Sequence, residues 1–150
     1  REPIEYVVDI GDVELCVYEW PGSGDPIMLL HATGFHSRCW DQVVKRLLGQ
    51  HVYAVDLRFH GRTAIPGDHR AVDWNVMAKD VEICIARLEL ERLVGVGHSI
   101  GGHLITRALQ RTGAQHKRQF RSLGRVIEAR DLELCTQRSL NHRRGEQLLF

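Results

Sequence analysis

The first twenty residues contain two hydrophobic segments with a turn signal between them. Residues 6–10 read YVVDI and residues 13–20 read VELCVYEW, and both segments are rich in β-branched and aromatic residues. Gly11-Asp12 separates them, and a glycine-containing pair between two such runs is typical of a hairpin turn. The pattern therefore predicts an antiparallel β-hairpin.

Beyond the hairpin, continuous apolar runs alternate with segments in which apolar residues recur every three or four positions. Continuous runs are typical of strands buried on both faces, and the spaced pattern is typical of amphipathic helices. The pattern predicts strands over 26–30, 51–57 and 92–97, and helices over 39–48, 74–88 and 100–112. Asp73 is the expected N-cap of the second helix. We therefore expect an α/β fold with three layers (α/β/α), whose mostly parallel sheet starts with the N-terminal antiparallel hairpin.

Three loops of this predicted fold carry polar, chemically capable residues. HATGFHS (31–37) follows the first of the three apolar strands, DLRFHGRT (56–63) follows the second, and GHSIGG (97–102) follows the third. In open α/β sheets, ligands bind outside the carboxyl ends of the strands. The three loops therefore predict one functional site at that edge of the sheet.

Gly97-His98-Ser99-Ile100-Gly101 has the pattern G-x-S-x-G and lies between a predicted strand and a predicted helix. A sharp strand-to-helix turn forces its central residue into a strained backbone conformation, and side chains at the flanking glycine positions would collide with the turn. Ser99 would then stand clear of the sheet, over the positive end of the following helix. The motif predicts a nucleophilic serine.

With these loops the chain resembles the α/β-hydrolase family. GHSIGGH is similar to that family's nucleophile elbow, LLHATGF to its oxyanion loop and DLRFHGRT to its loop after the preceding strand, and the resemblance covers about residues 1–112. It implies that Ser99 is the nucleophile and that the backbone N–H groups of Thr33 and Ile100 form the oxyanion hole. His31 is similar to a structural histidine that holds the oxyanion loop. The family usually has glycine where Phe59 stands.

The same resemblance suggests where substrate and triad partners would lie. Phe35 and Trp40 are expected to line the substrate pocket. The family's acid and histidine follow the serine in the chain, and the segment 123–129, LGRVIEA, is a candidate sixth strand with Asp131 near its carboxyl end. Asp131 is therefore a candidate acid and His142 a candidate base.

Charge divides the chain into two parts. Residues 1–110 hold 11 basic and 15 acidic residues, whereas residues 111–150 hold 9 basic and 4 acidic ones. We expect residues 1–112 to be the N-terminal portion of an α/β-hydrolase domain and residues 113–150 to be a basic tail that does not resemble the family, with one further strand and a helix as an option. On this interpretation the chain is a truncated or frame-shifted version of the fold.

Composition excludes several other classes of function. The four cysteines are scattered without a CxxC pair, which argues against a zinc ribbon and against a disulfide framework. His98 and His103 are five positions apart and lack a carboxylate at ligand spacing, so we expect no metal and no cofactor. The net charge of +1 gives no reason to expect nucleic acid or a membrane surface. We expect a cytoplasmic protein. The chain starts at Arg1, so the question whether a segment precedes it stays open. The oligomeric state also stays open.

The sequence leaves three functional hypotheses. The first is a serine hydrolase that acts on an ester, lactone or similar small carbonyl substrate through an acyl-enzyme at Ser99. The second is a catalytically inactive fragment that lacks the acid and the histidine of the triad. The third, a binding module with a basic tail, would need salt-sensitive binding of nucleic acid.

Overall fold

The apolar runs of the chain assemble into one six-stranded sheet with the order β1-β2-β4-β3-β5-β6. The computed structural model describes residues 1–64, 73–115 and 127–128. The strands are β1 (Ile4–Asp9), β2 (Glu14–Trp20), β3 (Ser23–Leu30), β4 (Gln50–Val55), β5 (Val94–Gly97) and β6 (Ile127–Glu128). The helices are a 3₁₀ helix, η1 (Ser37–Trp40), and the α-helices α1 (Asp41–Val44), α2 (Trp74–Arg87) and α3 (Ile100–Gln115).

Strand pairing follows the predicted arrangement. β1 and β2 form the antiparallel hairpin around Gly11, and β2 pairs antiparallel with β4. The pairs β3–β4, β3–β5 and β5–β6 are all parallel. The parallel strands therefore end at one edge of the sheet, where the three polar loops leave it.

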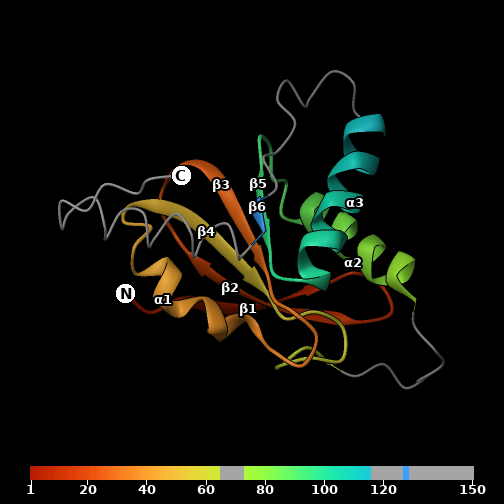
Figure 1. Ribbon diagram of the computed structural model, residues 1–150, viewed down its shortest axis with the longest axis horizontal. Coiled ribbons are helices and arrows are strands. Elements are labelled where there is room, and N and C mark those ends of the chain that lie inside the picture. The colour runs from red at the N-terminus through yellow and green to blue at the C-terminus, as the bar shows by residue number, and fades with distance from the viewer. Residues whose placement is uncertain (65–72, 116–126, 129–150) are drawn as a thin grey trace, which may run out of the picture.

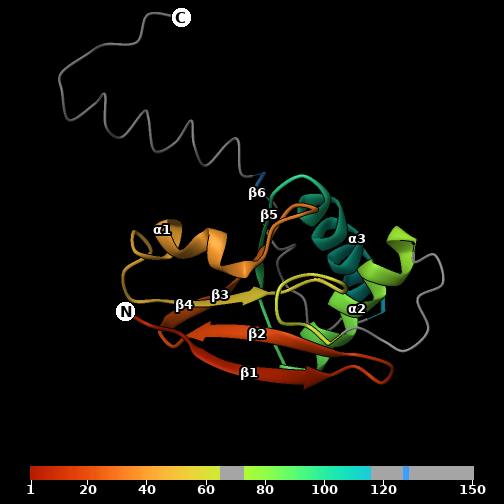
Figure 2. The ribbon, with the colours of Figure 1, turned by 90° about the horizontal axis from the view of Figure 1, so that it is seen from below.

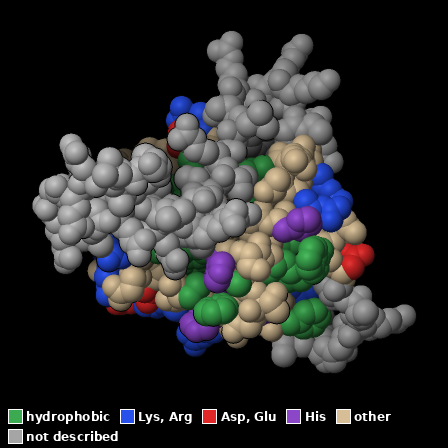
Figure 3. Space-filling model, viewed as in Figure 1, with side chains coloured by type: hydrophobic (Ala, Val, Ile, Leu, Met, Phe, Trp, Pro, Cys, Tyr) green, Lys and Arg blue, Asp and Glu red, His purple; other side chains and the backbone are tan. Residues whose placement is uncertain are grey.

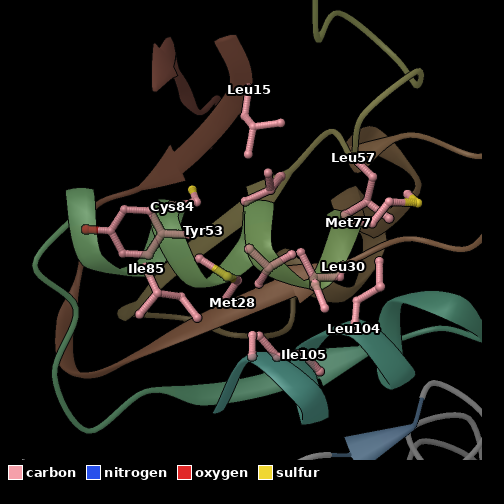
Figure 4. Packing of buried hydrophobic residues seen from close by; sticks show 14 of the residues in the cluster. Leu15, Met28, Leu30, Tyr53, Leu57, Met77, Cys84, Ile85, Leu104 and Ile105 are labelled. Atoms are coloured by element: carbon pink, nitrogen blue, oxygen red, sulfur yellow. The ribbon is translucent and has the colours of Figure 1, made fainter. Parts of the chain in front are cut away.

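Helices cover both faces of the sheet, as Figures 1 and 2 show. Helices α2 and α3 pack on one face, where side chains such as Met77, Ile85 and Leu104 meet Met28 and Leu30 from the sheet (Figure 4). On the other face, Trp40 and Val44 from η1 and α1 pack with a second set of strand residues (Cys16, Tyr18, Trp20, Leu29, Val52, Ala54, Val96). The three-layer α/β/α prediction is therefore confirmed.

The helix predicted over 39–48 is shorter and begins earlier than its hydrophobic pattern suggested. The chain forms η1 and then α1, which ends at Val44. The N–H groups of Arg46 and Leu47 then bond to carbonyls only three residues back. Such bonds tighten the chain into a turn, so the helix ends at Val44 and this turn leads to β4.

Strand limits also differ from those predicted, and the largest extension is in β3. β3 begins at Ser23 instead of 26, because the Ser23 N–H bonds to the Gly49 carbonyl at 2.8 Å and extends the ladder. An irregularity between Ser23 and Ile27 accommodates Pro26, which has no N–H to donate. Within the predicted segment 123–129, the structure describes β6 at residues 127–128, where it pairs with the end of β5.

A buried ion pair connects the loop after β4 to two other parts of the fold. Arg58 donates to both carboxylate oxygens of Asp80 on α2, at 2.7 Å each, and to both oxygens of Asp12 in the hairpin turn, at 2.8 and 2.9 Å. These bonds raise the pKa of the Arg58 guanidinium above its usual range. Arg58 and Asp80 are buried, so the network fixes α2 and the hairpin relative to the end of β4.

Candidate active site

Ser99 stands on a sharp turn between β5 and α3. Its φ of +54° lies in the left-handed region, which costs a non-glycine residue free energy. The turn is held by bonds from the Gly101 N–H to the His98 carbonyl and from the Gly102 N–H to the Ser99 carbonyl, both at 3.0 Å. The Ser99 side chain is exposed. A strained, exposed serine at this position fits the turn that the sequence motif predicted.

The glycines on either side of Ser99 are required by close packing. A Cβ on Gly97 would overlap the backbone of Gly101 and Gly102, and a Cβ on Gly101 would overlap the carbonyl groups of Leu30 and His31 at the end of β3. In addition, the His98 N–H donates to the Leu30 carbonyl at 3.0 Å. The elbow therefore lies directly against the loop that follows β3.

That loop presents its backbone at the same edge. The Phe35 N–H donates to the Ala32 carbonyl at 3.1 Å, which closes a turn with Thr33 and Gly34 at its centre, and Gly34 has a φ of +81°. Within the described residues, the N–H groups of Thr33 and Ile100 donate to no acceptor. Among the described residues, therefore, nothing occupies these two N–H groups.

His31 connects the loop after β3 to the loop after β4. It is fully buried, its Nδ1 donates to the Ala32 carbonyl at 2.8 Å, and its Nε2 accepts from the Leu57 N–H at 3.0 Å. Burial lowers the pKa of this imidazole, so it remains neutral in the tautomer that these two bonds require. His31 has no unoccupied nitrogen with which to accept a proton from a substrate or from Ser99.

Asp56 performs a similar task, and the sequence analysis did not single it out. This buried carboxylate, just after β4, accepts from the Ser37 N–H at 2.6 Å and from the Arg62 N–H at 2.8 Å. Its backbone carbonyl accepts from the Thr63 hydroxyl. Gly61 lies so close to the Asp56 carboxylate that a Cβ there would overlap it. Asp56 thereby shapes both loops beside the elbow.

The two predicted pocket residues lie in different environments. Phe35 is 50% exposed, and its ring meets the ring of His98 edge-on, with centroids 5.9 Å apart. Trp40 is only 4% exposed and packs in the core between α1 and the sheet, where it has little surface to offer a substrate.

The remaining predicted residues are not brought together with Ser99 by the part of the chain that the structure describes. Asp131 and His142 lie outside the described residues. Among those described, no side chain forms a hydrogen bond with the Ser99 hydroxyl, and no group of three or more His, Cys, Asp or Glu could hold a metal ion. None of the described helices is long and apolar enough to cross a membrane.

Comparison with known proteins places this site in a family. A family model described as "Alpha/beta hydrolase family" matches residues 27–145. The chain belongs to the alpha/beta hydrolase family. The match runs past residue 112, where the recognisable motifs end, and the division of the chain at that residue stays a prediction.

Individual relatives cover the part of the chain that holds the elbow. A non-heme haloperoxidase from Rhodococcus erythropolis is 37% identical over 111 residues, which is 73% of this chain and 39% of that protein. Among solved structures, E-2-(acetamidomethylene)succinate hydrolase shares 29% identity with a TM-score of 0.66 over 83% of this chain and 43% of its own. An esterase from Exiguobacterium antarcticum shares 25% identity with a TM-score of 0.62, over 77% of this chain and 41% of its own. The chain thus spans less than half the length of these relatives.

Proposed function

We propose that this chain is a serine hydrolase that acts on an ester, lactone or similar small carbonyl substrate, with Ser99 as its nucleophile. The observation that carries the proposal is the exposed, left-handed Ser99 on the turn between β5 and α3. The N–H groups of Thr33 and Ile100 at the same edge, which donate to no acceptor in the described part of the chain, support it. Family membership, and the likeness to an enzyme named as a hydrolase and to one named as an esterase, agree with this chemistry.

The reaction would proceed in two halves. The Ser99 oxygen attacks the carbonyl carbon while its proton passes to a base, and the carbonyl oxygen becomes an oxyanion that accepts hydrogen bonds from Thr33 and Ile100. Collapse of this intermediate expels the alcohol, which takes the proton, and leaves an ester at Ser99. Water then attacks that ester in the same manner and releases the carboxylic acid and the free serine.

This reaction needs a base that accepts the proton of Ser99 and an acid that orients that base. His142 and Asp131 are the proposed base and acid from the sequence, and both lie outside the described residues. The alternative function is that of an inactive fragment without a complete triad. It is motivated by the change of charge along the chain, from 11 basic and 15 acidic residues in 1–110 to 9 basic and 4 acidic residues in 111–150. A serine without a base is a weak nucleophile, so the two proposals differ in a measurable reactivity.

Labelling with a fluorophosphonate distinguishes them. The full chain is treated with the probe beside the Ser99→Ala variant and a control, Ser23→Ala, which removes another exposed hydroxyl. Labelling that disappears only in Ser99→Ala supports the hydrolase. Folded wild-type protein that takes up no label supports the inactive fragment. His142→Ala then tests the base, because it should abolish labelling without altering the circular dichroism spectrum.

A further inference from the structure

Exposed hydrophobic side chains gather at the edge of the sheet that carries Ser99. Phe35, Phe59, Trp74 and Val76 are 38–54% exposed, and all four lie in the loops after β3 and β4 or at the start of α2. Figure 3 shows hydrophobic and histidine side chains close together on this face of the molecule. Exposed apolar side chains that are grouped in this way mark a binding surface more often than isolated ones do.

Two of these rings are held beside the elbow by histidines. The Phe35 ring meets His98, the residue before Ser99, at a centroid distance of 5.9 Å and an interplanar angle of 62°. The Trp74 ring meets His103, one helical turn after Ser99, at 5.0 Å and 61°. Edge-to-face contacts of this kind fix ring orientation. Each ring is thus partly exposed and held in a defined position against a histidine that flanks Ser99 in the chain.

The backbone under Trp74 is fixed as well. Asp73 is the N-cap of α2, and its Oδ1 accepts from the Asn75 N–H at 2.7 Å and from the Val76 N–H at 3.0 Å. These hydrogen bonds lower the pKa of the Asp73 carboxyl, and the bond from the Val76 N–H has a larger effect than those from Asn75. The ionised Asp73 carboxylate therefore stabilises the start of α2, and Trp74 is held in place as the first residue of that helix.

The two segments closest to the serine carry no permanent charge. Residues 31–37 and 97–105 contain no Lys, Arg, Asp or Glu. A charged group on the substrate would lose water against these two segments without gaining an ion pair from them, which is unfavourable. An apolar group would instead cover the exposed faces of the rings, which is favourable.

We propose that Phe35 and Trp74 bind the apolar part of the substrate, and that the substrate is a neutral ester with an aryl group or an alkyl chain of several carbons beside the carbonyl. The proposal rests on the proposed function, since it describes the substrate of the same serine. It assigns Trp74 a role in specificity that the sequence motifs did not indicate.

Binding is tested without catalysis, in the full chain carrying Ser99→Ala. Trp20 and Trp40 are 1% and 4% exposed, so acrylamide quenches chiefly the fluorescence of Trp74. Neutral 4-phenyl-2-butanone should lower the acrylamide quenching constant at least two-fold in a saturable manner. Acetone and the anion 3-phenylpropionate should leave it unchanged. Equal protection by the anion, or no protection by the ketone, overturns the proposal.

Variants locate the bound ligand. Phe35→Ala should weaken the apparent affinity for 4-phenyl-2-butanone five- to ten-fold. Leu48→Ala removes another exposed hydrophobic side chain, 83% exposed between α1 and β4, and should leave the affinity unchanged. If both variants weaken binding equally, the ligand does not bind at Phe35 and the proposal fails.

A second readout uses the reactive protein. In the chain with Ser99 intact, an octyl fluorophosphonate should label faster than a methyl one, and Trp74→Ala should lower that rate ratio at least five-fold. Labelling by both probes at equal rates contradicts the apolar site while the serine hydrolase stands. If neither probe labels folded protein, the proposed function fails and the quenching experiment alone decides the binding site.

Discussion

The Nε2 atom of His31 accepts a hydrogen bond from the Leu57 N–H at 3.0 Å, and this bond joins the loops that follow β3 and β4. The interaction requires a neutral imidazole, because its Nδ1 already donates to the Ala32 carbonyl. Protonation of His31 would break the bond to Leu57. The loop that carries Thr33 is therefore stable only as long as this buried histidine stays uncharged.

We expect the stability of the protein to depend on pH through His31. Burial lowers the pKa of His31 in the folded chain below the ordinary value of 6.5. Below about pH 6.5 the unfolded chain therefore binds a proton at this histidine more readily than the folded chain does. The contribution of neutral His31 to the free energy of unfolding is fully present above about pH 6.5. It is lost as the pH falls toward the pKa of His31 in the folded state. His31→Gln, measured by thermal unfolding between pH 7.5 and 5.0, should be less stable at pH 7.5, with the gap narrowing at acid pH. A gap that stays constant would contradict this, and His36→Gln, at an exposed position, serves as control.

The Arg58 network predicts strongly unequal costs for its members. Arg58→Met leaves the buried Asp80 carboxylate unpaired and should lower the free energy of unfolding by about 3–5 kcal/mol. Asp12→Ala, at a carboxylate that is 66% exposed, should cost less than about 1 kcal/mol. The double variant Arg58→Met with Asp80→Leu should recover most of the loss. Urea unfolding measures all three, and a double variant no better than Arg58→Met would refute the argument.

Phe59 occupies a conformation that suits glycine. Its φ is +66°, in the left-handed region, and relief of that strain should exceed the entropy that a glycine adds to the unfolded chain. Phe59→Ala and Phe59→Gly both remove a ring that is 38% exposed and partly packed, but only glycine relieves the backbone strain, so Phe59→Gly should be more stable than Phe59→Ala by up to about 1 kcal/mol. Gly61→Ala, two residues on, should lower the free energy of unfolding by about 1–3 kcal/mol, because its Cβ would overlap the Asp56 carboxylate. All three variants are read from urea unfolding, and equal stability of Phe59→Gly and Phe59→Ala would count against strain at this position.

Gly101→Ala should impair the elbow more than it impairs the fold. The added Cβ would lie 2.7 Å from the His31 carbonyl oxygen and closer still to that of Leu30, so the elbow must move away from the loop after β3. We expect fluorophosphonate labelling of Ser99 to fall at least ten-fold, with circular dichroism retained. Gly11→Ala is the matched control: its φ of +111° makes alanine strained in the hairpin turn, but nothing lies within 4 Å of the added Cβ. Unchanged labelling in Gly101→Ala would show that the contact does not matter for reactivity.

The sequence predicted the elements whose hydrophobic period is strong and uninterrupted. The spacing of Met77, Val81 and Ile85 gave α2, with Asp73 as its cap, and the glycines around Ser99 gave the turn between β5 and α3. The segment after Trp40 has apolar residues at helical spacing but does not continue as a helix. Hydrogen bonds to carbonyls three residues back close it into a turn instead. Hydrophobic period alone does not distinguish a helix from such a turn.

The site was harder to predict than the fold. Asp56 was missed because a single acidic residue at a strand end has no distinctive pattern, and its role depends on the N–H group of Ser37, 19 positions away in the chain, as well as on that of Arg62 in its own loop. Trp40 was expected at the pocket and lies in the core, since its position in the sequence gives no sign of which face of the sheet η1 covers. Contacts between separate loops, rather than local sequence, determine both outcomes.

The contact of Gly101 with the Leu30 and His31 carbonyl groups has a consequence for how proteins of this kind can diverge. The contact between the elbow and the loop after β3 is made by main-chain atoms, so the exposed side chains at the rim take no part in it. Residues at the rim, such as Phe35 and Trp74, can therefore be exchanged with little effect on the nucleophile. A lineage could change its preferred substrate by single substitutions at these positions and keep its reaction chemistry throughout.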